Sequence, residues 1–238
     1  MSRMAITILT DYDRGALEDF RSLKGKGGHF ERSLFIAEGP KVSRKMIASR
    51  FEIPSAYMTP DHLEALRPAL EARSDTTTVY LDDHAEMERV IGYPLHQGLM
   101  LAVRIPPTPE LAQAAATWPD DATVIALDSI ADAENMGAII RSAAAFGVSA
   151  ILLDGRSCNP FLRRSVRVSM GTIADVPLVS VPDLARALAE LRLLRTNTHI
   201  IGAALGPTSR PIDEVARRDG TCVLVFGSEA VSYTHLTL

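Results

Sequence analysis

Five short apolar runs, separated by helical segments, dominate the second half of this chain. The runs cover residues 124–127, 150–153, 176–181, 200–205 and 222–226. Continuous apolar runs of this length are typical of strands that are buried on both faces of a sheet. Residues 136–146 and 183–195 between them have the apolar spacing of amphipathic helices. This alternation predicts an α/β domain with a parallel sheet, and parallel sheets bind ligands beyond the carboxyl ends of their strands.

Prolines and polar residues between positions 106 and 121 divide the chain into two halves. We predict an N-terminal domain over residues 1–105, a linker over 106–121 and a second domain over 122–230. In the N-terminal half the pattern predicts strands at 34–37, 56–58, 78–81 and 99–103, a helix through Val42, Met46 and Ile47, and a helix over 60–73. This half is therefore expected to be a small α/β or α+β domain.

Composition excludes several classes of protein. The chain has 238 residues, 47% of them hydrophobic and 23% charged, which is typical of globular proteins. The early apolar run over residues 5–9 is too short for a membrane span or a signal peptide. Cys158 and Cys222 have no zinc-site spacing, and the six histidines show no ligand spacing. We expect a soluble cytoplasmic protein without a metal site or a membrane segment.

Positive charge is concentrated in residues 21–50. This segment has a net charge of +6, although the chain as a whole has −4. A local basic block on an acidic protein suggests contact with a polyanion, and a solvated helix face is an equally good interpretation. Lys24 and Lys26 lie in a glycine-rich loop that fits contact with RNA better than a pyrophosphate site.

The first candidate site follows the run at 124–127. Asp132 or Asn135 can cap the helix that begins there, because both can accept hydrogen bonds from free backbone N–H groups. Arg141, about one turn beyond the start of this helix, shares a face with the small residues Ala138 and Ala145. It can therefore reach a phosphate with both arms of its guanidinium group. The alternative is an ordinary surface arginine on a capped helix.

Two further motifs lie at the same expected edge of the sheet. Gly227-Ser228-Glu229 follows the last apolar run, where a glycine turn suits a nucleotide-like cofactor, although a hairpin would look the same. Arg163 and Arg167 are four residues apart on one helix face. The pair is interpreted either as a phosphate-binding patch or as two solvated charges. The glycine motifs of Rossmann and P-loop proteins are absent from the sequence.

Together these motifs resemble the SpoU/TrmH family of S-adenosylmethionine-dependent RNA 2′-O-ribose methyltransferases, in the SPOUT superfamily. The resemblance is carried by Asn135-x-Gly137-x-x-x-Arg141 with residues 142–148, by 224–229, by 167–171, by 35–40 and by His96-Gln97-Gly98. It covers residues 20–229. It implies an N-terminal RNA-binding domain that is a ribosomal-protein-like α/β sandwich, and a C-terminal SPOUT-like domain with a trefoil knot.

The resemblance also implies the roles of particular residues. Arg141 and Asn135 would be catalytic, with Arg141 stabilising negative charge rather than acting as a base. S-adenosylmethionine would bind at Phe226, Gly227, Ser228 and Glu229. RNA, either tRNA or rRNA, would contact Lys24, Lys26, Arg32, Arg163 and Arg167. The family acts as a homodimer, so Arg141 is expected to serve the partner's site.

The resemblance stops after Glu229, where the family continues with a third motif and a final helix. Residues 231–238 match nothing in the family. We expect this tail to be foreign sequence and the knot to be incomplete. The rival interpretation is a non-catalytic RNA-binding protein with a disabled methyltransferase domain, and cofactor binding would distinguish the two. A generic Rossmann-like enzyme is disfavoured because its glycine fingerprint is missing.

Overall fold

The computed structural model describes residues 6–21, 28–95, 97–204, 209–211, 214–215 and 219–227. Its contacts divide the chain into two compact units. The first unit contains Met1–Pro106 and Phe161–Ala174, and the second contains Pro107–Pro160 and Asp175–Leu238. Residues 161–174 therefore group with the N-terminal half, although they lie within the predicted range of the C-terminal domain.

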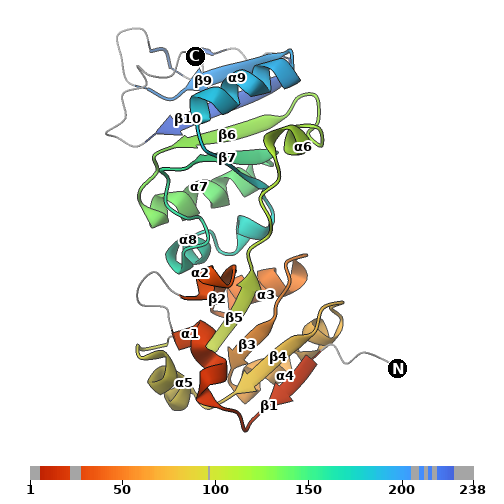
Figure 1. The fold of residues 1–238 in the computed structure, drawn as a ribbon, viewed down its shortest axis with the longest axis vertical. Coiled ribbons are helices and arrows are strands. Elements are labelled where there is room, and N and C mark those ends of the chain that lie inside the picture. Colours follow the sequence, from red (N-terminus) through yellow and green to blue (C-terminus); the bar gives the residue numbers. More distant parts are fainter. Residues whose placement is uncertain are drawn as a thin grey trace. The chain divides into compact units, whose positions relative to one another are not determined.

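The first unit is built on a mixed five-stranded sheet (Figure 1). Its strands are β1 (Ile6–Leu9), β2 (Leu34–Glu38), β3 (Ser55–Met58), β4 (Thr77–Leu81) and β5 (Leu99–Arg104), in the order β1-β4-β3-β5-β2. Strand β4 pairs in parallel with β1 and β3, whereas β5 pairs antiparallel with β2 and β3. The four strands predicted in this half are confirmed, and β1 was missed.

Several short helices accompany this sheet. They are η1 (Arg14–Leu17), α1 (Glu18–Arg21), α2 (Gly28–Glu31), α3 (Pro40–Ala48), α4 (Pro60–Glu71), α5 (His84–Ile91), α8 (Arg163–Val168) and η2 (Thr172–Ala174). Helices α3 and α4 confirm the two helices predicted here. Helix α5 was missed, although Asp83 caps its start and Gly92 ends it in the left-handed conformation, with φ of 80°.

The side chain of Arg73 caps the C-terminal end of α3. Its side chain is only 8% exposed. It binds Asp75 with two hydrogen bonds, from Nε to Oδ1 at 2.7 Å and from Nη2 to Oδ2 at 2.9 Å. It also donates from Nη1 to the carbonyl of Ser49 at 3.1 Å. A single guanidinium group therefore satisfies backbone carbonyls that the end of a helix leaves without partners.

The second unit contains a five-stranded sheet in which every neighbouring pair is parallel. Its strands are β6 (Thr123–Asp128), β7 (Ala150–Asp154), β8 (Leu178–Val181), β9 (Thr198–Gly202) and β10 (Thr221–Gly227), in the order β8-β7-β6-β10-β9. The predicted α/β class with a parallel sheet is confirmed. All carboxyl ends of these strands therefore lie at one edge of the sheet.

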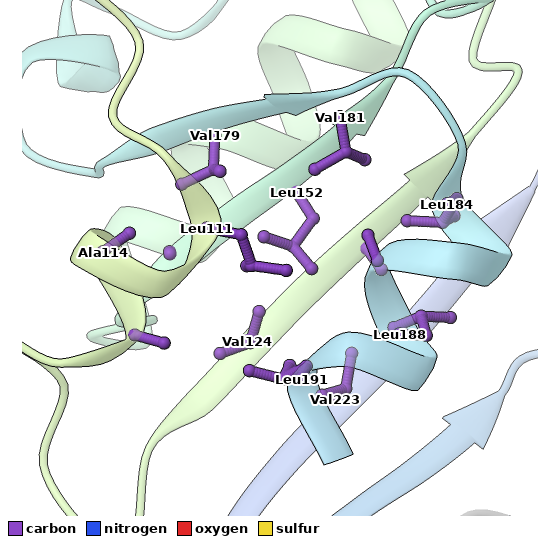
Figure 2. Packing of buried hydrophobic residues seen from close by; sticks show 14 of the residues in the cluster. Leu111, Ala114, Val124, Leu152, Val179, Val181, Leu184, Leu188, Leu191 and Val223 are labelled. Atoms are coloured by element: carbon purple, nitrogen blue, oxygen red, sulfur yellow. The ribbon is translucent and has the colours of Figure 1, made fainter. Parts of the chain in front are cut away.

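Helices α6 (Leu111–Ala115) and α9 (Leu184–Leu194) cover one face of this sheet (Figure 2). Leu111 and Leu188 from these helices pack against Val124, Leu152 and Val223 from the strands. Burial of each such side chain contributes about 1.5–3 kcal/mol to folding. Helix α7 (Ala133–Ala145) lies on the other side of the sheet (Figure 1). The second unit is thus a three-layer α/β structure.

Burial differs from the predicted pattern in both edge strands and in β10 of the second sheet. In the edge strand β8, Val179 and Val181 are buried, whereas Leu178 is half-buried and Ser180 is exposed, so the prediction of burial on both faces is wrong there. Strands β6 and β7 are buried on both faces, as predicted. The same prediction is wrong for β9, which is half-buried along its length because it is an edge strand. It is also wrong for β10, where burial alternates and Val223 and Val225 face the core.

Residues 106–121 were predicted as a linker in which residues 110–116 could form a short helix. They contain such a helix, α6, and Trp118 beyond it is buried in the core of the second unit. The predicted non-family tail, residues 231–238, lies outside the described residues, and the expectation of an incomplete knot stays a prediction.

Candidate functional site

The first motif forms the start of α7. Asp132 is the N-cap, and its Oδ1 accepts hydrogen bonds from the backbone N–H groups of Glu134 and Asn135, both at 2.8 Å. Of the two predicted caps, Asp132 is therefore the one used. The helix begins at Ala133, three residues earlier than predicted. Asn135 consequently lies in the first turn, exposed, and the buried Gly137 lies in the second turn rather than the first.

Arg141 is exposed on the outer face of α7 together with Ala138 and Ala145, and Ile140 is buried on the inner face, as predicted. No hydrogen bond or ion pair joins its guanidinium group to another described residue. It lies eight residues after Ala133, about 12 Å along the helix. The predicted position one turn beyond the helix start is therefore wrong, because the helix begins earlier than its apolar pattern suggested.

The second motif lies at the carboxyl edge of the sheet. Phe226 and Gly227 end strand β10, and both are half-buried. Gly227 is paired with Asp128, the last residue of β6. The topology thus brings Gly227 to the edge from which the loop to α7 and Asn135 departs, whereas Arg141 lies farther along the helix. Ser228 and Glu229 fall outside the described residues.

A network of charged and hydroxyl groups, which the sequence analysis missed, organises this same edge. Asp154, the last residue of β7, accepts three hydrogen bonds at Oδ1. They come from the backbone of Ser129 at 3.1 Å, the backbone of Ser157 at 2.9 Å and the hydroxyl of Ser157 at 2.6 Å. Ser129 has a φ of 60°, which is unusual for a residue with a side chain. Asp154 therefore holds the loop after β6 in its conformation.

Arg156 joins the carboxylates of two neighbouring strands. Its Nε donates to Oδ2 of Asp154 at 3.0 Å, and its Nη2 donates to Oδ1 of Asp128. The arginine side chain is 63% exposed, whereas the two carboxylates are buried. We call Asp128, Ser129, Asp154, Arg156 and Ser157 the edge network. A signal was available in the sequence, because both aspartates directly end buried apolar runs.

The edge network alters the titration of its members. Burial acts to raise the pKa of Asp154, but hydrogen bonds from Ser157, Ser129 and Arg156 outweigh it and hold the pKa below its usual value. The hydrogen bond to Asp154 and the charge of Asp128 raise the pKa of Arg156. The network borders a cavity of 340 Å³, which Pro182 and Asp183 at the start of α9 also line.

The residues predicted to bind RNA lie in different environments. Lys24 and Lys26 fall outside the described residues. Arg32 forms an ion pair with Asp19 at 2.6 Å. Arg167 is exposed, and no hydrogen bond or ion pair joins its side chain to the rest of the described chain.

The side chain of Arg163 is bound by other residues of the first unit. Its Nη1 donates to Oε2 of Glu38 at 3.1 Å, and its guanidinium carbon lies 4.5 Å from the centre of the Tyr93 ring. The Tyr93 hydroxyl is a further partner of Nη1. Burial raises the pKa of Tyr93 to about 12, although the nearby positive charge of Arg163 opposes this. Arg163 and Arg167, predicted as a pair on one helix face, therefore have different roles.

Metal-binding clusters and membrane-spanning helices were sought among the described residues. Within the described ranges, no group of three or more His, Cys, Asp or Glu residues could hold a metal ion. None of the helices that the structure describes is long and apolar enough to cross a bilayer.

Comparison with known proteins relates the second unit to a family of RNA-modifying enzymes. Residues 122–237 match the SpoU rRNA Methylase family. Over 186 residues the chain is 34% identical to a Mycobacterium bovis protein named as an uncharacterised tRNA/rRNA methyltransferase, covering 76% of this chain and 63% of that one. Over 154 residues it is 30% identical to the 23S rRNA (guanosine-2′-O-)-methyltransferase RlmB of Acinetobacter baylyi, covering 63% of this chain and 61% of that one.

A solved structure shares the fold across both units. The AdoMet-bound rRNA methyltransferase from Sinorhizobium meliloti superposes with a TM-score of 0.75 at 22% identity, covering 95% of this chain and 83% of that chain. The chain spans less than two thirds of the length of the two curated relatives.

Proposed function

We propose, because the chain belongs to the SpoU rRNA Methylase family through residues 122–237, that it transfers a methyl group from S-adenosylmethionine to a ribose 2′-hydroxyl of rRNA or tRNA. The observation that carries this proposal is Arg141, an exposed arginine without a described partner on the helix that bears the family's first motif. The RlmB relative, whose name specifies guanosine-2′-O methylation, supports the ribose as the acceptor. This substrate would place the reaction in the cytoplasm.

The end of β10 fits a nucleoside-bearing cofactor. Phe226 supplies half-buried apolar surface there, and Gly227 has no side chain to cover the carboxyl edge of the sheet. Bound at this edge, S-adenosylmethionine would supply an electrophilic methyl group. The edge network holds the neighbouring loops in place, so that little reorganisation would be needed on binding.

Arg141 and Asn135 have separate tasks in this proposal. A ribose hydroxyl is a poor nucleophile at neutral pH, so the protein must orient it and stabilise the negative charge that develops on its oxygen. Arginine keeps its proton and cannot act as an ordinary base. Arg141 would therefore hold the adjacent phosphate or the developing oxyanion, and Asn135 would orient the acceptor near the sheet edge.

The position of Arg141 favours a site completed by a second copy of the chain. Arg141 lies six residues after Asn135, about 9 Å farther along α7. Phe146, the residue that caps the end of this helix, is a large apolar side chain that is 85% exposed. We therefore include a homodimer in the proposal. Sedimentation should show a dimer that Phe146→Glu dissociates, and a wild-type monomer that remains active would remove this part of the proposal.

The central experiment measures cofactor binding and methyl transfer separately. We expect the chain to bind S-adenosylmethionine in calorimetry and to transfer labelled methyl groups to unmodified rRNA or tRNA. A methylated 2′-hydroxyl makes the following linkage resistant to alkali, so alkaline hydrolysis of the product distinguishes ribose from base methylation. RNA binding without any cofactor binding would instead establish the non-catalytic alternative.

The Arg141→Ala variant tests the assigned role. We expect its single-turnover rate to fall about 100-fold or more, as for the loss of one group that stabilises an oxyanion, with cofactor affinity within twofold of the wild type. Arg192→Ala, an exposed arginine on α9, is the matched control and should keep the wild-type rate. Near-normal methylation by Arg141→Ala would remove the catalytic assignment.

A further inference from the structure

Three sequence segments that the methyl-transfer chemistry does not use meet at one cavity of the first unit. The cavity measures 560 Å³, and its lining consists of Glu38, Gly39, Pro40, Lys41, Val42, Arg44, Gln97, Arg167 and Met170. The segments come from the end of β2 and the start of α3, from the turn before β5, and from α8. Cavities of this size accommodate small organic groups and not only single ions.

The backbone explains why the first two segments meet. Strands β2 and β5 are antiparallel, so that the end of β2 faces the start of β5, and the N–H of Gly39 donates to the carbonyl of Leu99 at 2.9 Å. Gly39 has a φ of 86°, and a Cβ atom there would lie 3.0 Å from Oε1 of Gln97. A glycine at position 39 thus permits both the turn and the close approach of Gln97.

A second glycine brings in the third segment. Gly171, with a φ of 81°, lies directly against α3, where a Cβ atom would come within 3.0 Å of Cβ of Lys45. This close approach holds the residues that follow α8 against the last turn of α3, while α8 itself contacts β2, the strand that leads into α3. Arg167 of α8 therefore lines the same cavity as Lys41 and Arg44.

The cavity is positively charged. Lys41, Arg44 and Arg167 are all exposed, and none of their side chains has a hydrogen bond or an ion pair with the described part of the chain. The one carboxylate in the lining, Glu38, is already paired with Arg163 at 3.1 Å. Three cations that have no described partner and that line one cavity will attract an anion. The two guanidinium groups match the geometry of phosphate oxygens.

The lining also indicates which phosphate compound fits. Its described residues include no aromatic ring on which a base could stack, so they offer contacts to a nucleic-acid backbone rather than to a base. Two of its cations, Lys41 and Arg44, belong to the basic segment over residues 21–50, which carries a net charge of +6. This concentration of positive charge favours an extended polyanion over a single small anion.

We propose that this cavity binds a phosphodiester group of the RNA backbone through Lys41, Arg44 and Arg167. This inference rests on the proposed function for the identity of the polyanion. It adds to it a site in the first unit that anchors the substrate away from the reacting ribose. Arg163 is a positioning residue here, because it neutralises Glu38 and leaves the three cations for the ligand.

Fluorescence anisotropy with labelled bulk tRNA and fragmented rRNA tests the site. In the triple variant Lys41→Gln, Arg44→Gln and Arg167→Gln, we expect RNA affinity to fall about 10-fold or more. The slope of log affinity against log salt should become shallower by about 2, since each lost contact to single-stranded RNA accounts for about 0.7. Arg67→Gln, an exposed arginine on α4 of the same unit, is the matched control and should bind RNA as the wild type does.

The outcomes separate this inference from the proposed function. RNA affinity within twofold of the wild type in the triple variant, with methyl transfer intact, would overturn the cavity assignment alone. A 10-fold loss of RNA affinity in a protein that methylates no RNA would support the cavity and overturn the methyl-transfer proposal. Calorimetry with inorganic phosphate is the last arm. Phosphate binding that the triple variant loses, with unchanged RNA binding, would show a free-phosphate site and overturn the RNA assignment.

Discussion

The edge network of the second unit and the basic cavity of the first unit use charge in opposite ways. In the edge network, Arg156 bridges the carboxylates of Asp128 and Asp154, and the remaining acceptors are filled by serines. In the basic cavity, Arg44 and Arg167 have no described partner. Charges that satisfy one another hold loops in place, whereas charges without partners are available to a ligand. Four predictions test this distinction, beginning with the largest effect.

Removal of an arginine whose hydrogen-bond donors all have partners should lower the free energy of unfolding the most. Arg73→Met deletes a side chain that is 8% exposed, and it removes the charged partner of Asp75 and the donor to the carbonyl of Ser49. We expect a loss of about 3 kcal/mol in the free energy of unfolding, because breaking a buried pair leaves one charge uncompensated. Hydrogen exchange of the β2 amides would measure this loss of stability in the first unit.

Arg67→Met is the control, because Arg67 forms an exposed ion pair with Glu71 at 3.5 Å. It should change the stability by less than about 0.5 kcal/mol. Equal effects of Arg67→Met and Arg73→Met on stability would contradict the assignment of Arg73 as the side chain that caps the end of α3.

Asp154→Asn should destabilise the second unit by about 2 kcal/mol at pH 7, because it weakens charge-assisted hydrogen bonds in the edge network. The pKa of Asp154 is lowered in the folded protein. Its stabilisation is therefore complete above the unfolded value of about 3.9 and is lost as the pH falls through the lower folded value.

Urea titrations that follow Trp118 would measure this effect, since Trp118 is the only tryptophan and lies in the core of the second unit. The difference between the wild type and Asp154→Asn should shrink below about pH 4. The exposed Asp120→Asn is the control and should show no difference at any pH. A difference that stays constant from neutral to strongly acidic pH would exclude an electrostatic origin.

Gly171→Ala should destabilise the first unit by about 2 kcal/mol, because it combines an unfavourable φ with a crowded Cβ position. Gly147→Ala provides the comparison, because Gly147 has a φ of 66° with no atom within 4 Å of the added Cβ. Its cost should be about 1 kcal/mol, from the backbone alone.

The two glycine variants should also differ in RNA binding. Displacement of α8 by Gly171→Ala should lower RNA affinity in the anisotropy assay, and Gly147→Ala should leave it unchanged. Equal RNA affinities for Gly171→Ala and the wild type would show that Arg167 does not depend on this contact for its position.

The smallest effect is expected from two exposed arginines of the second unit. Arg156→Gln should lower the melting temperature by less than Asp154→Asn does, because the arginine is largely exposed. Arg141→Gln should leave the melting temperature unchanged, since no described residue pairs with Arg141. A drop for Arg141→Gln as large as that for Arg156→Gln would remove the contrast between structural and ligand-directed arginines.

Sequence reasoning located most of the fold and part of the site. The strands of the second sheet were predicted because continuous apolar runs are a local signal. Asp132 was one of two candidate caps, and the choice between them depended on where α7 begins. The edge network was not predicted, because Arg156 lies 28 residues from Asp128 and no local pattern records such a pairing.

The sequence by itself determined the elements that follow from local periodicity and the motifs that resemble the SpoU/TrmH family. Only the tertiary structure decided that residues 161–174 pack within the first unit. It also decided that Arg163 pairs with Glu38, 125 residues earlier in the chain, while the side chain of Arg167 pairs with no described residue. The physical reason is that a helical pattern shows which residues share a face, whereas their partners depend on long-range packing at positions such as Gly171.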